Sequence, residues 1–477
     1  MTTVAQTDRT AADQKSGTVS EKLAQFVSDL SMSDVPAAVR AVARAHLLDG
    51  LGIALASSDM DFAHAVHDAA TQLGEGQEAH TIGFGTGLPA PAAALVNGTL
   101  IHGLDFDDTH IEAIYHATAP ALAAALAVGE AEHADGEATL LAYIIGLEVG
   151  CRIAAAAAGK FHDRGFHPTG IAGTFAAACV AAKLRNQDAS VLAHALGICA
   201  SQAAGTLELG QSWLKRLHPG WAAHSGIIAS TLAGAGFIGP LTIFEGERGL
   251  YGSHLGDPGA AAALNLHDLG SRWMSADIAI KPYPCCHFTH AFIDAALQIL
   301  TDLGGATLRP DEVDRIVCPT TERVMPSVTE PATKKQAPDT LYNAQFSVQY
   351  AVAYALVRGR VDLATFYDES LDDPQVLAMA AKVTCPVDPD SDFPKHFPGE
   401  VVIHLSTGGT VRRRVPASSG TPGNPLTPEA ITGKFTTNAA RTLPDEAVDA
   451  IAAMVDDLES LPDISTLVQA CVVSEPR

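Results

Sequence analysis

Acidic and imidazole side chains crowd one short stretch of an otherwise apolar sequence. The run from His102 to His110 reads His-Gly-Leu-Asp-Phe-Asp-Asp-Thr-His, and His116 follows it. Three Asp and three His this close together could bind a divalent metal ion. Because the run follows an Ala-rich segment with helical spacing, the same acids could instead be a solvated helix cap. The residues alone leave both interpretations open, although no closed metal-ligand set is evident elsewhere in the sequence.

A second candidate is His167, which stands before Pro168 at the start of a predicted helix. The positive end of a helix dipole disfavours the imidazolium form, and a neutral imidazole suits a general base. The alternative is a histidine packed in a loop without a chemical role. A chemical role for His167 therefore depends on which residues lie next to it in the folded protein.

A third candidate is the basic cluster of Lys215, Arg216 and His218, which lies between two tryptophans. It precedes a Gly- and Ala-rich segment from 220 to 236 that has helical spacing. Cations beside a helix start favour binding of a carboxylate. A solvated charge pair is the alternative, but the apolar flanking residues favour a site.

The fourth candidate segment runs from Lys281 to His290 and reads Lys-Pro-Tyr-Pro-Cys-Cys-His-Phe-Thr-His. It falls where the pattern of the chain changes, and pockets often form at such junctions. The two cysteines next to two histidines could suggest a nucleophile, but the segment contains no acid. We interpret the cysteine pair as packing residues.

The apolar pattern predicts how these segments are positioned. Residues 19–270 show helical spacing throughout, whereas 271–430 mixes helices with short alternating strands. The predicted strands are Val313–Cys318, Val401–Leu405 and Thr410–Val415, the last two joined by a Thr-Gly-Gly turn. In 431–477 an amphipathic helix, Asp445–Leu461, is free to pack back on the first part. Residues 1–18 are polar and predicted to be a disordered tail.

Composition excludes several classes of function. The chain has 477 residues, a net charge of −24 and eight scattered cysteines. Nucleic acid and anionic membranes both require a basic surface, so neither is an expected partner. The sequence has no signal-like apolar region at its start, no span of about 20 strongly apolar residues and no paired-cysteine framework. These features predict a cytoplasmic protein without a membrane segment.

Taken together, the motifs resemble the MmgE/PrpD family, whose members include 2-methylcitrate dehydratases, cis-aconitate decarboxylases and iminodisuccinate epimerases. The matching segments occur in the family's order from about Ser20 onward. They are His102–Thr109, His167-Pro168, His218–Ala223, Gly236–Pro240 with Glu245-Gly246, Lys281–Cys286, and Asn424–Thr427 with Lys434-Phe435. The resemblance implies a mainly α protein with a large all-helical domain and a smaller α/β (α+β) lid domain. It also implies a homodimer that uses neither a metal nor an organic cofactor.

The same resemblance implies the residues of the site. The catalytic set would be Asp105, His116, His167, Lys215 and, from the lid, His287. His116 stands one place later than the family pattern expects. In decarboxylase-like members the lid histidine comes five residues after the loop lysine, a position that Cys286 occupies here. Residues expected to bind the substrate are Thr109, His110, His218, Lys281 and His290.

The shared chemistry of such a site acts on a carbon next to a carboxylate. Loss of water needs a base for the proton alpha to the carboxylate and an acid for the departing hydroxyl. We therefore expect a hydro-lyase of the 2-methylcitrate dehydratase kind, acting on a small di- or tricarboxylate. The alternatives are a cis-aconitate-type decarboxylase and an iminodisuccinate-type epimerase. A non-enzymatic protein that binds a carboxylate on the same scaffold is a further alternative.

Overall fold

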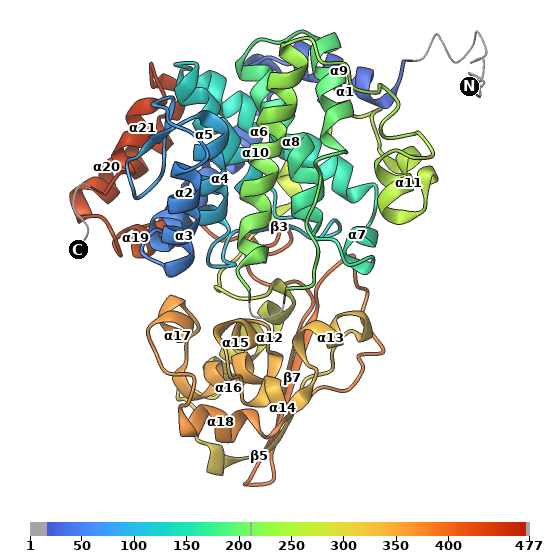
Figure 1. Ribbon diagram of the computed structural model, residues 1–477. Helices are drawn as coiled ribbons and strands as arrows, with labels where there is room; N and C mark the ends of the chain where they lie inside the picture. The colour runs from blue at the N-terminus through green and yellow to red at the C-terminus, as the bar shows by residue number, and fades with distance from the viewer. Residues whose placement is uncertain (1–16, 210–211, 474–477) are drawn as a thin grey trace.

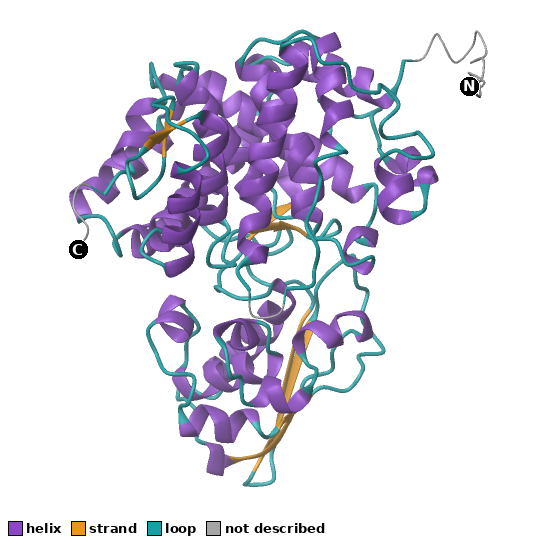
Figure 2. Cartoon of the chain, viewed as in Figure 1, coloured by secondary structure: helices purple, strands orange, loops and turns teal. Residues whose placement is uncertain are grey.

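The computed structural model describes residues 17–209 and 212–473, which form a large helical part and a smaller part below it in Figure 1. Each part has its own cluster of buried apolar residues. Figure 2 shows that strands are few and lie mainly in the smaller part. The protein is therefore mainly α with a smaller α/β part, which confirms the fold class that the sequence predicts.

The helical part combines the first half of the chain with its C-terminal end. The C-terminal helices α19 to α21 pack beside α2 and α5, so the chain returns to the helical part (Figure 1). Its helices are α1 (Val19–Asp29), α2 (Ala37–Ser57), α3 (Asp61–Thr71), α4 (Ala90–Ile101), α5 (Thr118–Ala131), α6 (Gly136–Ala155), α7 (Lys160–Asp163), α8 (Pro168–Leu184), α9 (Ala189–Cys199), α10 (Leu214–Gly234), α11 (Leu250–Leu255), α19 (Pro428–Ala439), α20 (Asp445–Asp456) and α21 (Ser465–Ala470).

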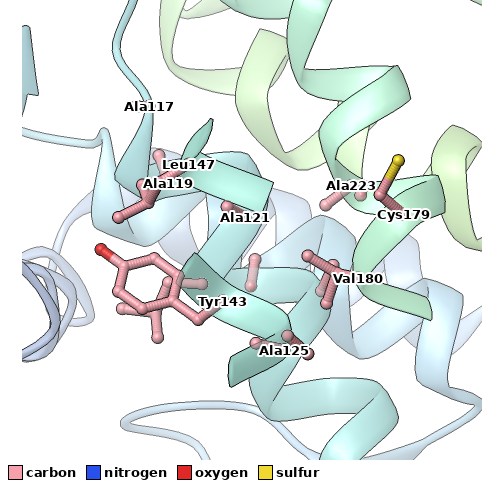
Figure 3. Packing of buried hydrophobic residues seen from close by; sticks show 14 of the residues in the cluster. Ala117, Ala119, Ala121, Ala125, Tyr143, Leu147, Cys179, Val180 and Ala223 are labelled. Carbon is pink, nitrogen blue, oxygen red and sulfur yellow. The ribbon is translucent and has the colours of Figure 1, made fainter. Parts of the chain in front are cut away.

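Small side chains let these helices pack closely. Figure 3 shows Ala121 and Ala125 of α5 facing larger residues such as Tyr143 and Val180 of the neighbouring helices. Nearly all of α5 and α6 is buried. The helix α6 is long and apolar enough to cross a membrane, but 89% of its most apolar window is buried inside the protein. Its apolar character is therefore explained by its place in the helical core.

The smaller part is built on a four-stranded sheet with the order β6-β5-β7-β8, in which only β5 and β6 are parallel. The helices α12 and α16 pack together on it. Its elements are β5 (Val313–Val317), β6 (Val383–Thr384), β7 (Gly399–Leu405), β8 (Thr410–Val415), α12 (His290–Asp302), α13 (Met325–Val328), α14 (Ala332–Gln336), α15 (Leu341–Gln345), α16 (Val348–Arg358), α17 (Leu363–Tyr367) and α18 (Pro374–Ala380). Short β1 (Ala79–His80) and β2 (Gly87–Leu88) pair separately in the helical part.

Two local features bring the polar segments together. The strands β3 (Asp108–His110) and β4 (Ile278–Ile280) form an antiparallel ribbon, which places the acidic run beside Lys281. The helices α4 and α10 cross closely at Gly98 and Gly220. A Cβ atom on Gly220 would lie 2.1 Å from the carbonyl oxygen of Leu95, so only glycine allows this approach. The crossing places the C-terminal end of α4 near the first turn of α10.

Two predicted boundaries are wrong. The basic cluster does not precede its helix, because α10 already begins at Leu214 and continues through Pro219. Lys215 and His218 therefore project from the first turns of a helix rather than from a loop. At the N-terminus, Thr18, the last residue of the predicted tail, caps α1 by accepting a hydrogen bond from the Glu21 amide and therefore belongs to the folded part. The rest of the predicted tail, residues 1–16, lies outside the described residues.

Candidate active site

Four segments that are far apart in the sequence meet between the helical part and the lid. They surround a cavity of about 670 Å³, a size typical of small-molecule sites. The acidic run enters after α4, His167 caps the start of α8, and Lys215 projects from the first turn of α10. The fourth segment follows β4. Predicted site residues that line the cavity are Asp105, Thr109, His116, His167, Lys215, Lys281 and His287.

Asp105 joins two of the lysines that line the cavity, the buried Lys281 and the partly buried Lys215. Its Oδ1 accepts hydrogen bonds from Lys215 Nζ at 2.8 Å and from Lys281 Nζ at 2.6 Å. Burial alone would raise the pKa of Asp105, but the two ammonium charges outweigh it and hold the pKa well below its ordinary value. Asp105 has a φ of 52° and its Oδ2 has no hydrogen-bond partner among the described residues. A carboxylate in a left-handed conformation is therefore held in place by two cations.

His102 lies behind Lys215 and links it to a second aspartate. Its Nδ1 donates to Asp107 Oδ2 at 2.8 Å, while its Nε2 lies 3.2 Å from Lys215 Nζ and accepts from it. Burial lowers the pKa of His102 well below its ordinary value, and the charge of Lys215 adds to this shift. Burial raises the pKa of Asp107 to about 6. The neutral imidazole therefore connects Asp107 to Lys215 through one hydrogen bond on each ring nitrogen.

His116 faces the cavity with one nitrogen free. Its Nδ1 donates to the carbonyl oxygen of Asp108 at 2.6 Å, which leaves the lone pair on Nε2. The ring of His116 lies 4.6 Å from that of His102, measured between ring centres. Burial holds the pKa of His116 well below its ordinary value. An imidazole in this tautomer can accept a proton at Nε2, as a general base must.

His167 contributes a second imidazole, whose ring centre lies 5.6 Å from that of His116. Its Nδ1 lies 3.1 Å from Nδ1 of His218, and its Nε2 has no partner among the described residues. Burial, with the charge of Lys215, holds the pKa of His167 well below its ordinary value. Burial likewise lowers the pKa of His218 to about 4. The first histidine meets the cavity and the second supports it from behind.

The lid side contributes His287 and Cys286 to the cavity lining. His287 Nε2 lies 3.2 Å from the hydroxyl of Ser418, and its Nδ1 is unpaired among the described residues. Burial lowers the pKa of His287 to about 3 and raises that of Cys286 to about 11. The thiol is therefore protonated at neutral pH and a poor nucleophile. His287 is thus the lid residue equipped for proton transfer.

The histidines also meet the spacing of a metal site. Ligand atoms of His102, His116 and His167 lie within 4.8 Å of one another, and imidazoles are common zinc ligands. However, the ammonium of Lys215 points at Nε2 of His102, the nitrogen that such an ion would need. Two like charges this close repel strongly in a buried site. The arrangement therefore suits an anionic ligand better than a cation.

Comparison with known proteins identifies the family of this chain. The model of the MmgE/PrpD N-terminal domain matches residues 21–262, and that of the MmgE/PrpD C-terminal domain matches residues 283–460. The chain belongs to the MmgE/PrpD family. The resemblance that the sequence motifs carry is thereby confirmed.

Among its relatives in this family, several are named cis-aconitate decarboxylases. A cis-aconitate decarboxylase-like protein of Aspergillus oryzae is 28% identical over 94% of this chain and 96% of its own length. The mouse cis-aconitate decarboxylase is 28% identical over 94% and 92% of the two chains. The human one is 30% identical over 80% and 79%. The similarity therefore extends through both parts of the MmgE/PrpD fold.

Three residues predicted to bind substrate do not line the cavity. His218 supports His167, and His290 lies behind His287 with their ring centres 4.7 Å apart. His110 is buried in β3, and neither ring nitrogen has a partner among the described residues. Burial lowers the pKa of His110 to about 4. Seven of the ten predicted site residues therefore line the cavity, and these three lie outside it.

Three residues that complete this site are absent from the predicted catalytic and substrate-binding sets. His102 and Asp107 stand inside the quoted acidic run, but only the fold shows that they support Lys215. Lys434, from α19, donates to the backbone behind the cavity. The match of Lys434-Phe435 to the family was the one available signal for it. The spacing of residues could not have revealed the contacts of Lys215 with His102 or of Lys434 with Phe106 and Lys281, because these contacts join distant segments.

Proposed function

We propose that this chain is a lyase that decarboxylates a small polycarboxylate of the cis-aconitate type with its own side chains. The observation that carries this proposal is the inner end of the cavity, where the buried Lys281 and the partly buried Lys215 share the single carboxylate Asp105 beside neutral imidazoles. Asp105 is the carboxylate that bonds both ammonium groups on the cavity side, whereas Asp107 lies behind His102 and outside the cavity lining. Two cations therefore face a single anion where the substrate would bind. The names of the relatives support the same substrate class.

The proposed reaction breaks the bond between a carboxylate carbon and the carbon that bears it. The electron pair stays on that carbon and spreads into a conjugated carboxylate, which Lys215 stabilises as negative charge develops. Carbon dioxide leaves, and an imidazolium then donates a proton to the carbon. The imidazole regains its proton from solvent, so the net change is one proton consumed and one carbon dioxide released.

The electrostatics of the site explain how that imidazolium would form. His116 and His167 are neutral because burial and the nearby lysine lower their pKa values. A bound polycarboxylate brings several negative charges next to the rings, and an adjacent opposite charge favours the protonated form. Substrate binding would therefore draw a proton onto one imidazole and so prepare the acid that the reaction needs.

A hydro-lyase is the second candidate, and one feature of the lid favours it. Cys286 occupies the place where the decarboxylase-like pattern has a histidine, and the next residue, His287, lines the cavity beside it. His116 and His167 of the helical part and His287 of the lid offer proton-transfer groups on two sides of the cavity. Loss of water uses such a pair as base and acid.

A substrate panel separates these functions. The purified chain is incubated with cis-aconitate, citrate, 2-methylcitrate and iminodisuccinate. Released carbon dioxide, loss of water and the chirality of each recovered acid are measured in parallel. Carbon dioxide from cis-aconitate is the expected result. Dehydration of 2-methylcitrate alone would favour the hydro-lyase, and no conversion of any acid would refute both. Full activity after treatment with a chelator would refute a metal-dependent mechanism.

A further inference from the structure

Lys434 has a side chain that is only 8% exposed, and it lies behind the cavity, where it lines a separate, smaller pocket. It projects from α19, more than 150 residues after Lys281 in the sequence. Its Nζ lies 2.7 Å from Asp49 Oδ1 and donates to the carbonyl oxygens of Phe106 at 2.7 Å and Lys281 at 2.8 Å. It also lies 3.8 Å from the centre of the Phe106 ring. Two of these contacts are therefore with the backbone of the site, at Phe106 and Lys281.

The two carbonyl groups belong to the segments that carry the central ion pair. Phe106 stands between Asp105, which binds both lysines of the cavity, and Asp107, which orients His102. Lys281 is the partner of Asp105 and donates to its backbone oxygen as well as its carboxylate. Lys434 therefore links the two segments that supply this ion pair, and it does so from the side away from the cavity.

The ammonium of Lys434 has no capacity left for a ligand. An ammonium group has three N–H donors, and Asp49, Phe106 and Lys281 accept all three. Its burial also separates it from the cavity lining. A role in binding substrate is therefore excluded by geometry, and any effect on the reaction must pass through the segments that it holds.

The strained backbone of Asp105 explains why the hydrogen bonds from Lys434 to the neighbouring segments matter. Asp105 has a positive φ, which non-glycine residues rarely adopt and which persists only where the surroundings enforce it. The bond from Lys434 to Phe106 acts on the next residue, and the bond to Lys281 acts on the group that pairs with Asp105. Both bonds would be lost if α19 did not return to the helical part.

We propose that Lys434 is a positioning residue, which holds Asp105 and Lys281 in the geometry that the proposed reaction needs. This inference rests on the proposed function, because its kinetic effect is defined on that reaction. It gives the C-terminal segment a part in the chemistry without any contact to substrate. A merely structural role would instead limit its effect to the amount of folded protein.

The kinetic test compares Lys434→Met with Lys183→Met in the full chain. Lys183 is a matched control, because its Nζ donates to three backbone carbonyls at the end of α1, far from the cavity. We expect Lys434→Met to lower kcat about 10- to 100-fold, as loss of supporting contacts around a site does, with KM changed by less than about threefold. Lys183→Met should keep the wild-type kcat.

The pH profile provides a readout that lost stability would not move. Asp49 and Asp107 lie near Lys434, and the ammonium favours their ionised forms. Its removal should therefore shift the acidic limb of the kcat profile upward by about half a pH unit or more. A Lys434→Met protein whose folded fraction has wild-type kcat and an unshifted profile would overturn the proposal.

Two further measurements keep the test decisive. If Lys434→Met does not fold, Lys434→Arg keeps the charge but replaces a compact ammonium by a planar fork. A fivefold or larger loss of kcat supports the proposal, and wild-type kcat overturns it. If the wild-type chain converts none of the acids, the proposed function fails separately. Hydrogen exchange then decides: faster exchange confined to residues 104–109 and 280–283 supports the positioning role, and unchanged or uniformly faster exchange overturns it.

Discussion

The isolated histidine in β3 should make the stability of this protein sensitive to mild acid. His110 is 3% exposed, and burial lowers its pKa from the ordinary 6.5 to about 4. Below pH 6.5 the unfolded chain binds a proton that the folded chain refuses, so stability falls as the pH falls towards 4. pH 5 lies 1.5 pH units below the ordinary pKa of 6.5. At 1.36 kcal/mol per unit, the free energy of unfolding is therefore lower by about 2 kcal/mol at pH 5.

The variant His110→Leu removes this titration while keeping a side chain of similar size. Denaturant unfolding of both proteins is followed by tryptophan fluorescence at pH 7.5 and pH 5. Other groups titrate in both proteins and cancel in the comparison. We expect the wild-type chain to lose about 2 kcal/mol more than the variant between the two pH values. If the two losses agree within about 0.5 kcal/mol, the reasoning from burial is refuted.

Three other predictions concern the cavity and the surface. Lys215→Met should lower kcat/KM about 10²- to 10³-fold in a protein with wild-type circular dichroism, because it removes a charge aimed at the transition state. Calorimetry in two buffers at pH 7 should show uptake of about one proton when the unreactive tricarboxylate tricarballylate binds, since the substrate charge raises the pKa of a buried imidazole; no uptake would contradict the proposed source of the acid. Leu214, Trp221 and Leu232 form an exposed, uncharged stripe along α10, on which a second, equally acidic copy could pack without charge repulsion. Light scattering should therefore find a dimer that Trp221→Glu converts to a monomer, and an unchanged mass would contradict this face.

The parts of the fold that follow from local pattern were predictable. Long apolar helices and an alternating hairpin carry strong periodic signals, and the segment Thr410–Val415 was predicted with the bounds that β8 has. The ribbon of β3 and β4 was not, because three-residue strands carry no periodicity and their partners are 170 residues apart. The start of α10 was misplaced because Pro219 normally interrupts a helix.

The candidate site was predictable in its lining and not in its support. Residues of the lining carry chemical types that stand out in apolar sequence, as Lys215 and His167 do. His110 stands out equally, yet the alternation of β3 turns it away from the cavity. Lys434 resembles any surface lysine of an amphipathic helix, and only the return of α19 buries it. Support of this kind arises from tertiary packing, which a single sequence does not encode locally.

The charge of the chain also changes meaning at the scale of the site. A net charge of −24 would repel a polycarboxylate if it acted as a whole, but exposed charges beyond about 8 Å are largely screened at physiological salt. The cavity itself is lined by four lysines and four carboxylates, and Arg323 pairs with one of the latter, Asp163. Attraction must therefore arise at short range from the lysines of the lining, of which Lys215 and Lys281 lie at the inner end of the cavity. Because these two share Asp105, a substrate carboxylate competes with a residue of the protein for the same cations, and binding must be completed by proton uptake on the imidazoles rather than by the lysines alone.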